Sequence, residues 1–218
     1  MSKIRILTAV AISIVPNNAV RLFLYRRVLG YEIGAGCRIG MLTIIACQSF
    51  SIGDRSIIRS RNVLKGKFAF RAGRDLFIGD RNAILAPWGS RSGADYAMSI
   101  TFGDDCLVND YHFIDVHGSV TIGDGTWIAG RDSQFYTHGV SVTDRDIEIG
   151  PGCYIGTAVR FAPGSGVGRR VLVGLGSVVV GRIEGDEMLV SGFPARPLRS
   201  IAEDLAKGRY RFSKLDWG

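Results

Sequence analysis

A repeat of six residues is the feature that most constrains the fold of this chain. An aliphatic residue, usually followed by glycine or another small residue, returns at every sixth position from Ile33 to about Ile183, with interruptions. The clearest run has five hexads in register: Ile149-Gly150, Ile155-Gly156, Phe161-Ala162, Val167-Gly168 and Val173-Gly174. A helix spaces apolar residues 3.6 positions apart and a simple strand two apart, so neither explains a period of six.

Each hexad supplies one short strand and one tight turn, so three hexads form one triangular coil. The aliphatic residue points inward and stacks on the coil below it, and glycine tolerates the backbone geometry of the turn. At 18 residues per coil, the repeat over residues 31–183 predicts a parallel β-helix of roughly seven coils. At 218 residues, the chain is long enough for one domain of this kind with attachments.

Interruptions of the repeat divide the chain further. The aliphatic residues stop at about 67–76, 87–99 and 139–148, and we expect loops there that protrude from the prism and carry binding residues. After residue 183 the pattern gives way to a closing segment over 184–218, with a helix expected at 199–207 and a basic tail.

Residues 1–30 form an amphipathic segment with an unusual charge. All five of its basic residues precede the first acidic residue, Glu32: Lys3, Arg5, Arg21, Arg26 and Arg27. An apolar run over 6–15, too short to cross a bilayer, is followed by a break at 16–18 and a predicted helix over 19–29. Three alternatives stay open: a cap on the end of the core, a basic element on an anionic membrane surface, and a secretory signal, although no A-x-A cleavage site follows.

Composition and motifs exclude several functions. The four cysteines, at 37, 47, 106 and 153, form no C-x-x-C pair and indicate buried reduced thiols of a cytoplasmic protein rather than disulfides or a zinc site. No dinucleotide-binding, Walker or H-E-x-x-H motif is present. The net charge of +7 is concentrated in the apolar N-terminal segment, so we expect no nucleic-acid partner.

Three features together resemble the hexapeptide-repeat acyltransferases over residues 31–202. They are the hexads, a histidine just before an external loop in the run QFYTHG at 134–139, and the closing run SGFPARPL at 191–198. With Ile128-Ala129, the histidine run is most similar to the coil that carries the catalytic histidine in bacterial sugar and polysaccharide O-acetyltransferases. The resemblance implies a left-handed, all-β parallel β-helix, a homotrimer, acetyl-CoA or another acyl-CoA as co-substrate, no metal, and a sugar or glycan acceptor.

The three histidines give a short set of candidates for the base that such a transfer requires. His138 matches the family motif, and we assign it as the catalytic base. His117 lies about one coil earlier, where it either stacks near His138 or is an ordinary corner residue, and His112 is either a core histidine or part of the acceptor pocket. The candidate substrate-binding residues are Asn109, Asp110, Tyr111, His112, Asp115, His117 and Tyr136.

By the same resemblance, the active site lies in a groove between neighbouring prisms, and the pantetheine arm runs along the C-terminal coils. The candidate coenzyme-binding residues are Gly156, Thr157, Ala158, Gly174, Ser177, Arg196 and Arg199, of which the arginines suit the coenzyme phosphates. Simple turn geometry is the alternative for the glycines. Because Ile128 and Phe135 are seven residues apart, either Gln134 points inward or one residue bulges near His138.

Two rival functions stay open. His112-x4-His117 is superficially similar to part of the ligand set of β-helix carbonic anhydrases, but here the third histidine follows the pair by 21 residues instead of preceding it. The other rival is a β-helix without catalysis that serves as an assembly module. The N-terminal segment adds the hypothesis of an enzyme at the cytoplasmic face of a membrane, acting on lipid-linked or nascent surface glycans.

Overall fold

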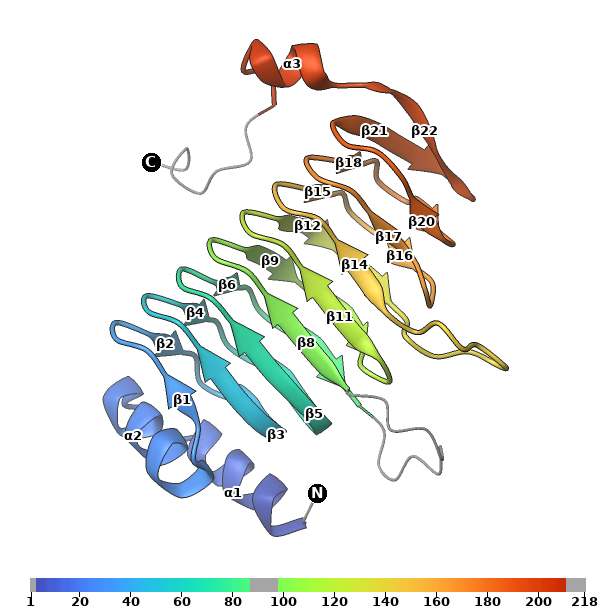
Figure 1. Ribbon diagram of the computed structural model, residues 1–218. Helices are drawn as coiled ribbons and strands as arrows, with labels where there is room; N and C mark the ends of the chain where they lie inside the picture. Colours follow the sequence, from blue (N-terminus) through green and yellow to red (C-terminus); the bar gives the residue numbers. More distant parts are fainter. Residues whose placement is uncertain (1–2, 87–97, 211–218) are drawn as a thin grey trace.

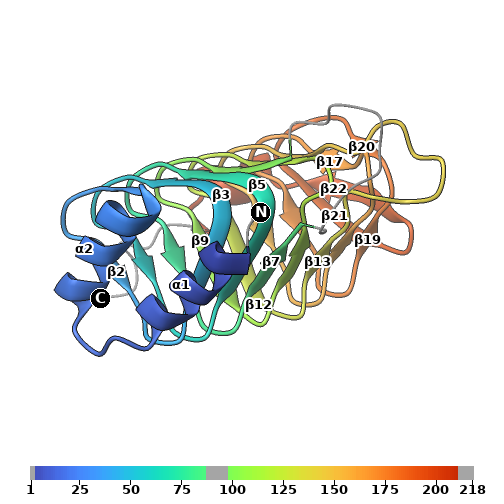
Figure 2. The same ribbon diagram turned by 90° about the horizontal axis from the view of Figure 1, so that it is seen from below.

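The computed structural model describes residues 3–86 and 98–210, which form a triangular prism of short parallel strands with helices at its N-terminal end (Figure 1). The strands wind as a left-handed parallel β-helix, as predicted. In Figure 2 the coils follow one another obliquely from the N-terminal helices, on the left, to the C-terminal coils, on the right. In each coil the chain passes from one flat face to the next at three corners. We name the faces A, B and C and the corners AB, BC and CA.

Each face is a stack of strands, and all of them are parallel except the last pair on face C, which is antiparallel. Face A contains β7 (Ala83–Leu85), β10 (Phe113–Asp115), β13 (Gln134–Phe135), β16 (Arg160–Phe161) and β19 (Val178–Val179). Face B contains β1 (Glu32–Ile33), β8 (Ser99–Phe102), β11 (Ser119–Ile122), β14 (Ile147–Ile149), β17 (Gly166–Val167) and β20 (Arg182–Ile183). Face C contains β2 (Arg38–Ile39), β4 (Ile57–Ile58), β6 (Phe77–Ile78), β9 (Leu107–Asp110), β12 (Trp127–Arg131), β15 (Tyr154–Ile155), β18 (Leu172–Val173), β21 (Met188–Gly192) and β22 (Ala195–Ser200).

The core consists of inward-pointing side chains that stack from coil to coil. On face C the hexad residues of successive coils form a fully buried ladder: Ile39, Ile58, Ile78, Val108, Ile128, Ile155, Val173 and Val190. Near the N-terminal end, aromatic rings continue the stack, with centroids 5.3 Å apart for Tyr31 and Phe50 and 5.0 Å apart for Phe50 and Phe70. Burial of this apolar surface is what holds strands of only two residues together.

Helices α1 (Lys3–Ser13) and α2 (Asn18–Leu29) cover the first coil. The Asn17 side chain caps α2 by accepting from two backbone amides, and Gly30 ends the helix at φ 69°. The inner surface of the helices buries Ile12 and Tyr25 against the core. Arg21 donates to the Ile39 carbonyl, so the helices also satisfy main-chain groups of the first coil.

Two of the three expected loops can be compared with the structure. Residues 67–76 do not protrude: they are largely the second half of β5 (Val63–Ala72), which together with β3 (Ile44–Ile52) turns the AB corner without interruption. The prediction was wrong there because Phe68 and Phe70 alternate inward with a period of two, which keeps the strand going. Residues 139–146 connect β13 to β14 and extend from the prism, and 87–97 lie outside the described residues.

Two further expectations concern local geometry. The extra residue between Ile128 and Phe135 is accommodated as a bulge in β12, where the register shifts and Gly130 takes φ 65°, so Phe135 keeps its inward position. The C-terminal helix is shorter than expected: α3 (Ala202–Ala206) begins after Arg199 and Ser200, which pair with β21 instead.

The cysteines and the helices complete the comparison. All four cysteines are buried and free, as predicted, and burial raises the pKa of Cys153 to about 11. Within residues 3–86 and 98–210, no helix is both long enough and apolar enough to span a membrane.

Candidate active site

Asp115, at the end of β10, joins two histidines at the AB corner. One carboxylate oxygen lies 2.7 Å from Nδ1 of His117, and the other lies 2.8 Å from Nδ1 of His138. The two imidazole rings lie against each other, with centroids 4.3 Å apart. The structure therefore brings three of the predicted site residues into one hydrogen-bonded cluster.

The register of the coils explains why the histidines meet. Phe113 pairs with Gln134 and Ile114 with Phe135, an offset of 21 residues between β10 and β13. The same offset places His117 beside His138 on the next coil. The bulge in β12 contributes to this offset, so the irregularity that the sequence flagged helps to align the two rings.

Thr137 fixes the cluster, and the sequence analysis missed it. Its amide donates to the Asp115 carboxylate at 3.2 Å, and its hydroxyl donates to the Asp115 carbonyl at 2.9 Å. The same hydroxyl accepts from the backbone amides of His117, at 2.6 Å, and Gly118, at 3.0 Å. A polar residue at a fully buried corner position, directly before the motif histidine, was the available signal.

Burial and tautomer decide what the cluster can do chemically. The Asp115 side chain is 7% exposed, the His117 side chain 22% and the His138 side chain 51%. An ionised carboxylate only accepts hydrogen bonds, so each neutral histidine carries its proton on Nδ1 and keeps a lone pair on Nε2. The site thus holds a buried acceptor, an exposed base and a second base next to it.

The loop over 139–146 packs beside this cluster. Asp146 accepts from the backbone amide of Ser119 at 2.8 Å, and the Arg145 side chain lies so close to Gly118 that no Cβ would fit there. Glycine is therefore required next to His117 for the loop to reach its position. Tyr136, another predicted site residue, is half-buried on face A against Phe113, with ring centroids 5.6 Å apart.

The remaining substrate-binding candidates lie elsewhere, at the CA corner. Asn109 and Asp110 end β9, and Tyr111 follows in the turn. The Asp110 carboxylate accepts from the backbone amide of Asp80 at 2.6 Å, and the exposed Tyr111 ring lies under the guanidinium of Arg131. These contacts link neighbouring coils, and none of them involves the histidine pair.

His112 is a buried corner residue. Its Nδ1 accepts from the Ser133 amide at 3.1 Å, in a stack that begins with Asn62 and Asn82. Burial lowers the pKa of His112 to about 4, so the ring is neutral at physiological pH. Within the described residues its Nε2 has no hydrogen-bond partner. Of the two alternatives for His112, this placement agrees with a core histidine and not with a residue of the acceptor pocket.

Five coenzyme candidates also lie at the CA corner, in the C-terminal coils. Gly156, Thr157 and Ala158 form one turn, Gly174 and Ser177 belong to the next, and the Gly176 amide donates to the Thr157 carbonyl at 2.8 Å. The Ser177 side chain is buried. This corner and the histidine cluster are separated by the width of face A.

The two candidate arginines lie on the closing hairpin. Both belong to β22 and are exposed. Arg199 donates to the Asp204 carboxylate at 2.6 Å, whereas Arg196 donates to the carbonyl of Ala195, at 3.2 Å. Arg199 thus shares its charge with a carboxylate, and Arg196 is the better placed of the two to pair with a phosphate.

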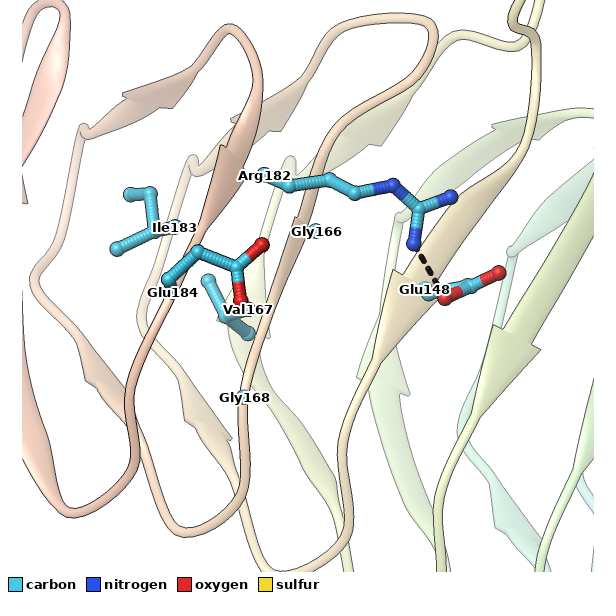
Figure 3. A pocket seen from close by; sticks show the side chains of 7 residues that line it. All are labelled: Glu148, Gly166, Val167, Gly168, Arg182, Ile183 and Glu184. Carbon is cyan, nitrogen blue, oxygen red and sulfur yellow. Dashed lines mark hydrogen bonds and ion pairs between the residues drawn. The ribbon is translucent and has the colours of Figure 1, made fainter.

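A pocket of about 180 Å³ opens on face B, between β14, β17 and β20 (Figure 3). Gly166 lines it, where a Cβ would collide with the Glu148 carbonyl, and Arg182 reaches across to form an ion pair with Glu148. None of the predicted site residues lines it. It lies on the face that follows the histidine corner.

The histidine cluster also has the composition of a metal site. Single ligand atoms of Asp115, His117 and His138 all lie within 4.8 Å of one another. Two imidazoles and a carboxylate suit zinc and other divalent transition metals. His112, which the carbonic anhydrase alternative required, is not in this group.

Comparisons with known proteins agree with the fold. No protein-family model matches the chain. A "probable acetyltransferase" of Mycobacterium tuberculosis is 31% identical over 133 residues, which are 59% of this chain and 43% of the relative. The chain therefore matches less than half the length of that protein.

Solved structures extend the comparison. The UDP-N-acetylglucosamine acyltransferase of Campylobacter jejuni superposes with a TM-score of 0.54 at 15% identity, over 86% of this chain and 76% of that chain. A hexapeptide-repeat-containing acetyltransferase of Vibrio cholerae has a TM-score of 0.46 at 22% identity, over 89% and 87% of the two chains. The chain shares the fold of the Campylobacter acyltransferase, a left-handed parallel β-helix, and the resemblance that its repeat predicted is confirmed at the level of the fold.

Proposed function

We propose that this protein is an acyl-CoA-dependent O-acyltransferase that transfers an acetyl group to a hydroxyl of a sugar or glycan. The observation that carries the proposal is the pairing of His138 with Asp115, 2.8 Å apart, at an exposed corner of the prism. A base held in one tautomer by a buried carboxylate is what hydroxyl activation requires. The fold and the name of the mycobacterial relative support the reaction class, and the choice of a sugar rests on the motif resemblance.

The proposed reaction moves one proton and exchanges one bond. Nε2 of His138 removes the proton of the acceptor hydroxyl while its oxygen attacks the thioester carbonyl. The tetrahedral intermediate then collapses, the carbon–sulfur bond breaks, and His138 returns the proton to the departing thiolate. Asp115 accepts a hydrogen bond from the protonated Nδ1 of His138 throughout, and it stabilises the positive charge that His138 carries between the two transfers.

The coenzyme is proposed to bind along the CA corner of the C-terminal coils. Arg196 is the candidate for a phosphate contact because it is exposed and its recorded hydrogen bond is to a neutral carbonyl. Since face A separates this corner from His138 within one chain, we propose that a homotrimer brings the coenzyme corner of one protomer to the histidine corner of another.

We also propose that residues 1–30 contact the cytoplasmic face of a membrane, so that the enzyme acts near lipid-linked or nascent glycans.

A metal-dependent reaction is the second candidate function. The spacing of Asp115, His117 and His138 favours it, because these ligand atoms lie within 4.8 Å of one another. In that case a divalent metal ion would bind tightly and a chelator would abolish the activity. For acyl transfer by His138, treatment with a chelator leaves the rate unchanged.

The decisive experiment combines coenzyme binding with turnover. Acetyl-CoA binding is measured by titration calorimetry, and release of the coenzyme thiol is measured over a panel of sugars, for wild type and for His138→Ala, His117→Ala and His112→Asn. We expect binding by all four proteins and loss of turnover in His138→Ala, with His112→Asn as the matched control that retains activity. Absence of acetyl-CoA binding by wild type would refute acyl transfer, and binding with turnover that survives His138→Ala would refute the assigned base.

A further inference from the structure

The outward surface of the two N-terminal helices is unusually apolar. Seven of the fifteen large hydrophobic side chains that are exposed in the described part of the chain lie within residues 4–28. Leu7 is 69% exposed and Phe23 is 57% exposed. We call this surface the cap face: Ile4, Leu7, Val10, Ile14, Val20, Phe23 and Val28. A cluster of this size on one end of a molecule indicates a binding surface rather than scattered exposure.

Helical spacing puts three of these residues on one side of α1. Ile4, Leu7 and Ile14 are three and seven residues apart, so along α1 and its C-terminal end they point the same way. The opposite side of α1 packs against the core, where Ala9 and Ile12 are buried. A rotation of α1 that buried Leu7 would therefore expose Ala9 and Ile12.

The positive charge of the same segment favours a negatively charged partner. Residues 3–31 carry five basic side chains and no acidic one. Three of these arginines bond to neutral main-chain groups: Arg5 to the Cys47 carbonyl, Arg21 to the Ile39 carbonyl and Arg26 to the Ile33 carbonyl. Lys3, Arg26 and Arg27 are exposed at the rim of the cap face. The surface thus offers apolar residues with positive charge around them.

We infer that the cap face docks on an anionic lipid bilayer, with α1 and α2 lying in the membrane interface. Such a bilayer supplies both negative headgroups for the rim and an acyl region for Leu7 and Phe23. A second copy of the same face would set five positive charges against five, which opposes self-association. The inference deepens the membrane contact in the proposed function and does not depend on acyl transfer.

The position of the helices suits this role. Both lie at the N-terminal end of the prism, whereas α3 lies at the opposite end (Figure 1). Docking at this end leaves the sides of the prism, including the AB corner with His138, facing the aqueous phase. Substrates presented at the membrane surface would then reach the histidines from the side.

The test is co-sedimentation of the full chain with vesicles. Wild type is compared with the double variant Leu7→Ser/Phe23→Ser and with a matched control, Val180→Ser/Leu198→Ser, which replaces exposed apolar side chains away from the cap face. Vesicles of phosphatidylglycerol mixed with phosphatidylcholine are compared with vesicles of phosphatidylcholine alone. Thermal unfolding of each variant establishes that the substitutions leave the fold intact.

We expect wild type and the control to bind the anionic vesicles and the cap variant to bind at least about tenfold more weakly, since two large apolar contacts are removed. Binding to phosphatidylcholine alone is expected to be weaker for all three, and added salt should weaken binding to anionic vesicles. Equal binding by the cap variant and the control would overturn the inference. So would a wild-type protein that binds no vesicles but self-associates through Leu7 and Phe23 in sedimentation experiments.

Discussion

At the scale of single residues, one buried carboxylate serves two imidazoles. Asp115 has two oxygens, and His117 and His138 use one each. Because Thr137 also donates to this carboxylate, Asp115 cannot rotate without losing several hydrogen bonds together. The orientation of His138 is therefore set by the backbone of two coils rather than by the exposed loop beside it.

Replacement of Asp115 by asparagine tests this arrangement. An amide retains the size of the side chain but offers only one accepting oxygen, so the two Nδ1 protons can no longer both be accepted. We expect kcat to fall by about 100-fold or more, with little change in the KM for the acyl donor. Asp132→Asn, an exposed aspartate at the CA corner, is the control and should retain wild-type kcat. An unchanged kcat in Asp115→Asn would argue against the assigned role.

His112 gives a prediction about stability and pH. Its pKa falls from 6.5 to about 4 on burial, so the folded protein takes up this proton less readily than the unfolded chain. The stability it contributes is complete above pH 6.5 and is lost as the pH falls toward 4, by up to about 3 kcal/mol.

His112→Asn extends the asparagine stack of Asn62 and Asn82 and removes this proton site. In urea unfolding over a pH series, we expect the variant to gain stability relative to wild type as the pH falls from 6.5 to 4. A constant difference between the two proteins across that range would contradict the assignment. Unchanged turnover at neutral pH would further separate His112 from the acceptor pocket.

At the scale of elements, the turns determine the spacing of the coils more than the strands do. Strands of two residues have little register of their own, and the corner residues fix the spacing between coils. Gly130, in the bulge of β12, has φ 65°, and a Cβ there would overlap the Thr157 side chain of the next coil. This glycine is required both for its backbone conformation and for the close approach of two coils.

Gly125 and Gly130 have nearly the same positive φ, so comparing them separates the cost of the backbone conformation from the cost of the close approach. Gly125 has φ 64° but open space around it, so Gly125→Ala should cost only the backbone strain, about 1 kcal/mol. Gly130→Ala adds the overlap with Thr157 and should cost roughly 1–3 kcal/mol more. Denaturant unfolding of the two variants measures the difference, and equal losses would show that the coils separate freely at this point.

At the scale of the whole molecule, the histidine corner and the coenzyme corner are separated by face A. A single prism therefore holds the two halves of the proposed site apart. A trimer in which each groove combines one corner from each of two neighbours would join them. The proposed activity then belongs to the assembly rather than to the chain.

Subunit mixing tests that consequence. His138→Ala lacks the base, and Arg196→Glu weakens coenzyme binding, so each homotrimer should be inactive at low acetyl-CoA concentration. In randomly mixed trimers, each groove takes its histidine corner from one protomer and its coenzyme corner from another. Each corner is intact in about half of the grooves, so both are intact, and wild-type activity is recovered, in about one quarter of them. Activity no higher than that of the separate variants would place the whole site in one chain.

The sequence predicted the fold well because a period of six leaves few alternatives. Each aliphatic hexad residue examined on face C is buried, and the histidine motif pointed to the corner where the cluster lies. The helix predicted over 19–29 is observed as Asn18–Leu29. These features depend on the order of residues within short segments, so they can be predicted from the sequence alone.

Other features could not be predicted because they depend on the stacking offset between coils. The pairing of Asp115 with both histidines needs the offset of 21 residues, which includes a bulge whose position the sequence left open. Asn109, Asp110 and Tyr111 are close to Asp115 in the chain, but face A lies between their corner and the corner of Asp115. Residues 67–76 form no loop because Phe68 and Phe70 point inward with a period of two, which differs from the six-residue repeat.

The contacts of the N-terminal helices with the first coil have a consequence for polymerisation. A parallel β-helix ends in an open strand edge, and such edges invite another chain to add on, coil after coil, into a fibre. Here Tyr25, Tyr31 and Arg21 donate to the carbonyls of Thr43, Ile45 and Ile39, which occupies acceptors that an incoming strand would need. The two helices thus make a repetitive structure finite, and a chain without them would present a template for its own growth.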